Sequence, residues 1–164
     1  MASADPQHRF RDDGRSHYDY LDDIVVTCPK CAATGRIVPC GVARGHPKIA
    51  AFAPRRFQCS GCNHRAESRG GIVSFGTDGR DPYLRLPLRL QARTRYGMLY
   101  AYNAAHLDWI EAFVAAPLRE RRIPVGRANR SIASRLPVWV KAAKNREDVL
   151  RALARMRRGL VADR

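Results

Sequence analysis

The chain has 164 residues and a formal net charge of +15 at pH 7, with 30 basic residues against 15 acidic ones. This length allows one ordinary domain or two very small ones. No apolar run approaches the roughly 18 residues of a membrane-spanning helix, and the N-terminus lacks the apolar core of a signal peptide, so the sequence predicts a cytoplasmic protein without a membrane partner.

The first 78 residues divide into a polar tail and a small β-rich unit. Residues 1–22 carry mixed charges without a hydrophobic period, which predicts a mobile tail in which His17 is solvated. Residues 23–78 hold two strand–turn–strand patterns, at 24–40 and 55–69, and each turn contains a CxxC pair. Two hairpins that each carry a cysteine turn are typical of a zinc ribbon.

The remaining residues, 79–164, begin with a second β-rich stretch. Leucines alternate with other residues over 84–90, and period-two alternation predicts a half-buried strand. The apolar segment 98–102 is its expected partner, with a turn between them.

Helical signals fill the rest of this part of the chain. Asn103 is expected to cap a helix that Pro117 ends near residue 116. Ser131 and Asn145 are expected to cap two later helices. The predicted fold class is therefore α+β, with a small all-β four-cysteine zinc ribbon followed by a β-hairpin and a C-terminal helical segment.

The four clustered cysteines are Cys28, Cys31, Cys59 and Cys62, and 27 residues separate the two pairs. In a tight turn, thiolates three positions apart can bind one ion while the backbone N–H groups between them point at the sulfur atoms. Two such turns complete a closed tetrahedral shell, the geometry of structural Zn²⁺. One structural zinc ion is therefore the expected cofactor.

Other uses of these cysteines fit the pattern less well. A redox pair needs a βαβ setting and would not need two copies, and a reducing cytoplasm disfavours disulfides. An iron–sulfur cluster accepts four thiolates but is less common with this symmetric spacing. A catalytic zinc would keep one coordination position open. Cys40 is interpreted as a small core residue, and His64 as exposed beside its turn.

The residue after each CxxC pair is expected to take a left-handed backbone conformation, which favours glycine. Here these residues are Ala32 and Asn63. Asparagine tolerates this conformation and alanine adopts it at a cost, so the first turn is expected to be strained.

The charge is distributed unevenly along the chain, with −3 over 1–23, +6 over 24–78 and +12 over 79–164. Codon usage could explain arginine in place of lysine, but it does not explain the shortage of acids. The surplus predicts nucleic acid as the partner. The candidate contacts are Arg55, Arg56, Arg65, Arg85, Arg89, Arg121, Arg122, Arg127, Arg130, Lys141, Lys144, Arg151 and Arg155.

Catalytic signals are missing from the sequence. It has no GxSxG, HExxH, P-loop or GxGxxG motif, and its few acids form no obvious pair. The sequence therefore predicts a non-enzymatic protein with no catalytic residues and no small-molecule substrate.

The stretch "DDIVVTCPKC…RRFQCSGC" resembles the zinc ribbons of transcription factors and RNA-polymerase-associated proteins. A longer set of stretches, including "DPYLRLPLRLQ", "GMLYAYNAAHLDWIEAFV" and "NRSIASRLPVWVKAAKNREDVLRAL", resembles an uncharacterised bacterial group of zinc-ribbon proteins. The resemblance implies a four-cysteine ribbon joined to a small α/β segment. It implies no particular activity, because zinc ribbons serve DNA, RNA and protein partners alike.

The sequence thus supports two hypotheses about function. The first is a zinc-binding protein that associates with DNA or RNA, with a role related to transcription. The alternative is a protein–protein adaptor on RNA polymerase or the ribosome, whose basic surface would meet acidic protein or RNA within the larger particle.

Overall fold

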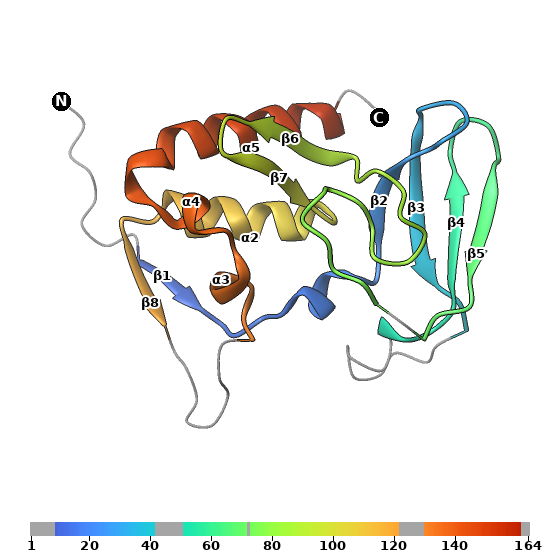
Figure 1. Ribbon diagram of the computed structural model, residues 1–164, viewed down its shortest axis with the longest axis horizontal. Coiled ribbons are helices and arrows are strands. Elements are labelled where there is room, and N and C mark those ends of the chain that lie inside the picture. The colour runs from blue at the N-terminus through green and yellow to red at the C-terminus, as the bar shows by residue number, and fades with distance from the viewer. Residues whose placement is uncertain (1–8, 42–50, 72, 122–129, 162–164) are drawn as a thin grey trace.

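The structure, a computed structural model, describes residues 9–41, 51–71, 73–121 and 130–161. It confirms the α+β class, because antiparallel sheets and hairpins combine with a C-terminal helical region (Figure 1). The cysteine-bearing sheet forms one end of the molecule, and the long helices lie toward the other end (Figure 1).

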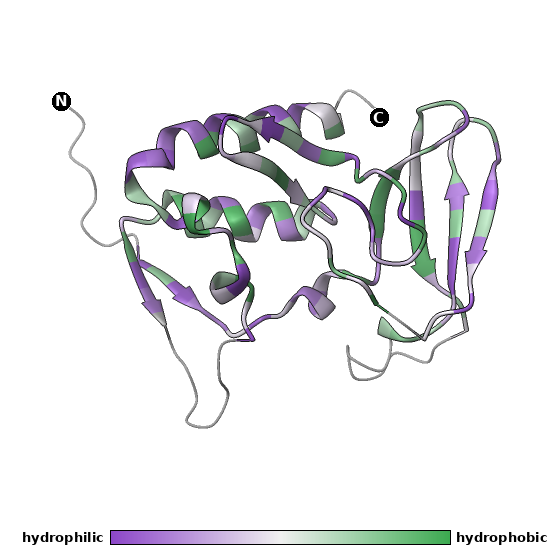
Figure 2. Ribbon diagram, in the orientation of Figure 1, coloured by the Kyte–Doolittle hydropathy of each residue, from purple (hydrophilic) through white to green (hydrophobic). Residues whose placement is uncertain are grey.

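The sheet at this end has four antiparallel strands in the order β2-β3-β4-β5. The strands are β2 (Ile24–Thr27), β3 (Thr34–Pro39), β4 (Arg55–Cys59) and β5 (Arg65–Ser68). Buried and exposed residues alternate along β4, so this strand has one packed face and one solvent-exposed face. Hydrophilic and hydrophobic residues both occur along the same strand (Figure 2). In β2, by contrast, Ile24, Val25 and Val26 are all buried. On the packed face, Ile37 lies opposite Phe57, and both side chains are fully buried.

Gly35 of β3 makes this packing possible. A Cβ atom at this position would lie 2.2 Å from the ring of Phe57, so any side chain would displace the aromatic ring from the core. Burial of a ring of this size stabilises the fold by roughly 1.5–3 kcal/mol.

The sheet is joined to the rest of the molecule through β2. Val26 forms an antiparallel bridge with Leu88, and the amide N–H of Thr27 donates to the carbonyl of Pro87 at 2.8 Å. The N–H of Val25 donates to the carbonyl of Tyr102, also at 2.8 Å. One hydrophobic core therefore runs from the ribbon strands into the helices.

The strand predicted over 84–90 does not form as expected, and this prediction is wrong for most of its length. The buried carboxylate of Asp81 accepts the backbone N–H groups of Leu84 and Leu86, at 2.8 and 2.5 Å, and so bends the chain into a turn. Arg85 has a positive φ of 59° between them. The first regular strand, β6 (Leu90–Thr94), begins only at the end of the predicted range and pairs with β7 (Gly97–Ala101).

The helix that follows has the expected boundaries. Asn103 caps α2 (Ala104–Ala115), because its Oδ1 atom accepts the N–H of His106 at 2.9 Å. The helix ends with Ala116 as its C-cap, directly before Pro117, as the sequence predicts.

Three short helical segments lead from this region to the last helix: α3 (Ile132–Arg135), α4 (Val138–Lys141) and η2 (Ala143–Asn145). Ser131 caps α3 as predicted, since its side chain accepts the N–H of Ser134. Asn145 directly precedes α5 (Arg146–Val161), and its side-chain amide donates to the carbonyl of Trp139 at 3.0 Å. Among the described helices, none is long and apolar enough to span a membrane.

The prediction of a mobile tail is wrong for residues 9–22. Strand β1 (Arg9–Asp12) pairs in parallel with β8 (Leu118–Arg121), a strand that the sequence did not predict. The segment continues through η1 (His17–Tyr20), and Tyr20 and Leu21 are buried. Asn103 Nδ2 donates to the carbonyls of Tyr20 and Asp23, both at 3.0 Å, so the residue that caps α2 also holds this segment in place.

Two histidines meet where the N-terminal segment packs on α2, with their ring centroids 6.0 Å apart, although the sequence predicted solvent around His17. His106 is buried between the rings of Tyr20 and Tyr102, at centroid distances of 4.8 and 5.2 Å. Its Nδ1 atom accepts the N–H of Tyr102, while its Nε2 atom and the Nδ1 atom of His17 are enclosed without a hydrogen-bond partner. Burial lowers the pKa of His17 to about 4 and that of His106 to about 3, and Arg135 adds to the effect on His17.

These pKa values predict a protein that loses stability in mild acid. The unfolded chain binds protons on both imidazoles below about pH 6.5, whereas the folded chain keeps them neutral. The stabilisation is therefore complete above about pH 6.5 and is lost as the pH falls toward the folded pKa values. The expected loss is about 2 kcal/mol per histidine between pH 7.5 and 5, measured by urea unfolding.

The variant His17→Phe isolates this effect, because it keeps a ring in contact with Phe75 and Tyr102 and removes one titrating group. It should lose about half as much stability over the same pH range as the wild type. Retention of bound metal, followed in parallel, serves as the control for acid-driven metal release. An unchanged pH dependence in the variant would contradict the assignment.

Candidate metal centre

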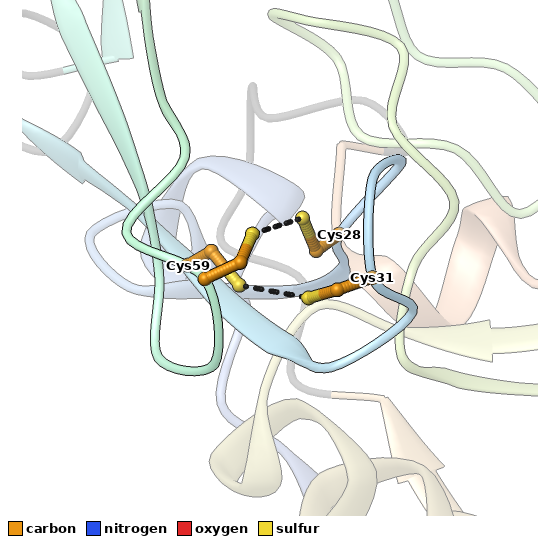
Figure 3. A group of neighbouring side chains, drawn as sticks. Cys28, Cys31 and Cys59 are labelled. Atoms are coloured by element: carbon orange, nitrogen blue, oxygen red, sulfur yellow. Dashed lines mark hydrogen bonds between the residues drawn. The ribbon is translucent and has the colours of Figure 1, made fainter.

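The four cysteines meet where two turns of the ribbon sheet approach each other (Figure 3). Cys28 and Cys31 lie in the turn between β2 and β3. Cys59 ends β4, and Cys62 lies in the turn that precedes β5. The pairing of β3 with β4 places Gly35 opposite Cys59 and so brings the two turns to the same end of the sheet.

The two turns have the same internal hydrogen bonds. The N–H of Lys30 donates to Cys28 Sγ at 3.4 Å, and the N–H of Gly61 donates to Cys59 Sγ at 3.2 Å. The turn is closed in each case by the first cysteine, whose own N–H donates to the carbonyl five residues later, at 2.8 and 2.9 Å. The sequence prediction that backbone N–H groups point at the sulfur atoms is therefore confirmed.

The sulfur positions fit a single tetrahedral ion. Cys28 Sγ lies 3.8 Å from Cys62 Sγ, and Cys31 Sγ lies 3.5 Å from Cys59 Sγ (Figure 3). All four sulfur atoms lie within 4.8 Å of one another. Metal–sulfur bonds of about 2.3 Å in a tetrahedron place the sulfur atoms about 3.8 Å apart. The four cysteines can therefore hold one metal ion between them.

The environment of the thiols favours metal over four free thiols. Backbone N–H groups, that of Cys62 first, lower the pKa of Cys59 to about 6. The N–H of Ala33 acts in the same direction on Cys31, but the neighbouring thiols of Cys62 and Cys59 raise the pKa of Cys31 to about 12. Ionisation of one thiol thus disfavours ionisation of its neighbours, and a bound divalent cation would offset this repulsion between thiolates.

The backbone conformations at the two turns agree with the sequence prediction. Ala32 has a φ of 61° and Asn63 a φ of 58°, so both residues after the cysteine pairs are left-handed. Gly61, which the sequence did not single out, is required for another reason, since a Cβ atom there would lie 2.7 Å from Cβ of Ala33. The two turns can approach each other only because one of them carries a glycine at this contact.

The remaining sulfur and imidazole groups of the ribbon do not join the site. Cys40 is a half-buried free thiol at the end of β3, outside the group of converging ligand atoms. His64 is half-buried with its ring 5.7 Å from that of Phe57. Within the described residues, the four cysteines therefore form an all-thiol shell with no other ligand type in it.

One of the candidate nucleic-acid contacts, Arg55, does not lie on the surface, and the prediction for it is wrong. Arg55 is fully buried, donates to the carbonyl of Leu21 at 2.6 Å and covers the ring of Tyr83 at 4.4 Å. Alternation along β4 places Arg55 on the same face as Phe57, and this parity in the sequence was the signal that could have shown its burial.

Several other candidates already have protein partners. Arg56 pairs with Glu67 at 3.3 Å, Arg85 with Asp78 at 2.5 Å, and Arg151 with Asp148. Arg89 and Lys141 donate to backbone carbonyls. Arg65, Arg130, Lys144 and Arg155 are exposed and have no ion-pair partner among the described residues. The side chain of Arg121 and residues Arg122 and Arg127 lie outside the described part of the chain.

No family model, curated protein or solved structure matches this chain. The likeness to zinc ribbons therefore depends on the paired CxxC turns and on the sheet that carries them. The function has to be inferred from the chemistry of the residues and from their positions.

The geometry of the site predicts that metal occupancy depends on the four clustered cysteines and does not depend on Cys40. Purified wild-type protein should carry one zinc ion per chain, measured by elemental analysis, and Cys31→Ser should lose most of it. Cys40→Ser is the matched control and should keep full occupancy, because Cys40 lies outside the site. Equal metal loss in both variants, or a full zinc complement in Cys31→Ser, would contradict the assignment.

The left-handed alanine predicts a stabilising substitution. Ala32→Gly removes the steric cost of a Cβ atom at a φ of 61°, so the zinc-loaded protein should gain about 0.5–1 kcal/mol of unfolding free energy in urea. Ala33→Gly is the neighbouring control. It should destabilise the protein, because Ala33 has no positive φ and packs against the core.

Proposed function

We propose that this protein is a zinc-binding, non-enzymatic protein that associates with nucleic acid. Zinc is the metal that four thiolates at tetrahedral spacing suit best, since it accepts soft sulfur ligands and prefers this geometry. The ion would bind Cys28, Cys31, Cys59 and Cys62.

The role proposed for the zinc ion is structural. Four thiolates leave no open position for water or substrate, which a catalytic zinc requires. The ion would tie the β2–β3 turn to the β4–β5 turn, and its binding free energy would add to the stability of this small sheet.

The observation that carries the nucleic-acid proposal is the surplus of cations over acids in the C-terminal region. Residues 130–161 contain nine basic residues and two acidic ones, a net charge of +7. Several of the cations are exposed without an acidic partner among the described residues. A surface of this kind attracts a polyanion through release of its counterions.

The proposal predicts binding to nucleic acid that weakens steeply with salt. Zinc-loaded protein is titrated into labelled DNA and RNA at 50 mM NaCl and at higher salt, and affinity is followed by fluorescence anisotropy. The affinity should fall by about tenfold or more between 50 and 200 mM salt if several phosphates are neutralised. The absence of binding to either nucleic acid at 50 mM salt would overturn the proposal.

A pull-down from lysate, with and without nuclease, separates this function from the adaptor hypothesis. Partners lost after nuclease treatment would indicate attachment through nucleic acid. A protein partner such as RNA polymerase that is retained after nuclease, together with no direct binding in the anisotropy assay, would favour the adaptor.

A further inference from the structure

The exposed side of α5 carries a line of arginines. Over residues 151–160 of this helix, the exposed side chains with a charge are those of Arg151, Arg155 and Arg158, and this stretch contains no acid. Arg151 pairs with Asp148 of the preceding turn. Their spacing of four and three residues places them on one side of the helix, along roughly 10 Å of its axis. These three residues are called the α5 ridge below.

Arg155 and Arg158 have no partner among the described residues, so their guanidinium groups are available for a ligand. Some cations of the ribbon are already paired, since Arg36 pairs with Asp23 at 2.6 Å and Arg56 pairs with Glu67. Arg65 and Arg69 are exposed and have no ion-pair partner among the described residues. Four thiolates around a divalent ion would also add a charge of about −2 to the ribbon. The ribbon is therefore a weaker attractor of anions than α5.

The α5 ridge is held in a fixed orientation by contacts on the other sides of the helix. Arg157 pairs with Asp108 of α2 at 2.6 Å and also contacts Glu111. Asp148, in the first turn of α5, binds Arg95 at 2.5 Å and accepts a hydrogen bond from the hydroxyl of Tyr96 at 3.0 Å. Figure 1 shows α5 along one side of the molecule, with α2 beneath it.

The aromatic residues near the α5 ridge pack against each other and are not exposed for stacking on bases. Tyr96 stacks on Trp139, with ring centroids 5.8 Å apart, and both are half-buried. Among the described residues, Phe52 is the one exposed aromatic side chain, and it packs near Tyr18 of η1. Proteins that hold single strands stack the bases on exposed aromatic rings, and the α5 ridge offers no such platform.

We infer that the α5 ridge, with Arg95 beside it, binds the phosphate backbone of a nucleic-acid duplex without reading its bases. A duplex carries one negative charge per about 1.7 Å of its axis, counted over both strands, so about 10 Å of duplex holds about six phosphate charges, of which those on the facing side can be bound. Guanidinium groups bind phosphate oxygens through paired hydrogen bonds. The inference rests on the proposed function and adds the surface and the form of the nucleic acid.

The test compares two charge reversals of equal size. Arg155→Glu with Arg158→Glu alters the α5 ridge, and Arg65→Glu with Arg69→Glu alters exposed cations of the ribbon; each pair lowers the formal net charge from +15 to +11. Zinc-loaded proteins are titrated by anisotropy into a 20-base-pair DNA duplex, a 20-base-pair RNA duplex and single-stranded (dT)20 across a salt series.

The double variant Arg155→Glu with Arg158→Glu (the helix pair) should weaken duplex binding by about tenfold or more. It should also lower the magnitude of the slope of log affinity against log salt by about two, because two phosphate contacts are lost. The double variant Arg65→Glu with Arg69→Glu is called the ribbon pair. The ribbon pair should cause a clearly smaller loss. The two duplex arms show whether the ligand is DNA, RNA or both, and (dT)20 should bind more weakly than the preferred duplex. The variants Arg155→Gln and Arg158→Gln, combined, should give the same direction of change if the glutamates disturb the helix end.

The outcomes separate the inference from the proposed function. Equal losses in the helix and ribbon pairs overturn the surface assignment while the proposed function stands. Binding of (dT)20 as tight as that of the preferred duplex overturns the duplex assignment alone. No binding of the wild type to any of the three probes overturns the proposed function itself.

Discussion

The convergence of four cysteine thiols at one end of a sheet is the constraint on which the ribbon depends. The two turns lie at opposite ends of a long connection in the chain, and each is a short loop with little apolar surface of its own. Their sulfur atoms nevertheless lie within 4.8 Å of one another, close enough to share one ion. Gly61 permits the close approach of the turns, and the N–H donors of Lys30 and Gly61 orient the sulfur atoms. The site and the strand register are therefore mutually dependent, because a shift of β3 against β4 by one residue would separate the two turns.

The ribbon is not an isolated module, because polar contacts connect it to the helical part. Asn103 caps α2 through one end of its amide and binds two carbonyls of the N-terminal segment through the other. The buried guanidinium of Arg55 reaches the carbonyl of Leu21, which lies in the same segment. The backbone of β2 bonds to residues near Leu88 and to Tyr102. Loss of metal from the ribbon should therefore destabilise the shared hydrophobic core as well as the cysteine turns.

The distribution of charge on the folded chain differs from its distribution along the sequence. Many of the arginines serve the fold: Arg157 joins two helices, Arg55 donates to the carbonyl of Leu21, and Arg119 donates to the carbonyl of Lys141 at 2.7 Å. What remains for a partner is a smaller set of exposed cations, of which the α5 ridge is the most regular. An all-thiol site and a basic helix without exposed aromatic residues beside it are the grounds for proposing attachment to a nucleic-acid backbone rather than recognition of bases.

The features that could be predicted from the sequence are those that short-range chemistry controls. The CxxC spacing, the left-handed Ala32 and Asn63, the cap at Asn103 and the stop at Pro117 all depend on residues within a few positions of each other. The features that only the tertiary structure decided depend on distant partners. Residues 9–12 become a strand because β8 lies beside them. Arg55 is buried because its strand turns that face to the core. The leucine alternation over 84–90 does not produce a strand, because the carboxylate of Asp81 binds the backbone there. A local pattern states what a segment can form, and the competition for buried hydrogen bonds in the folded chain decides what it does form.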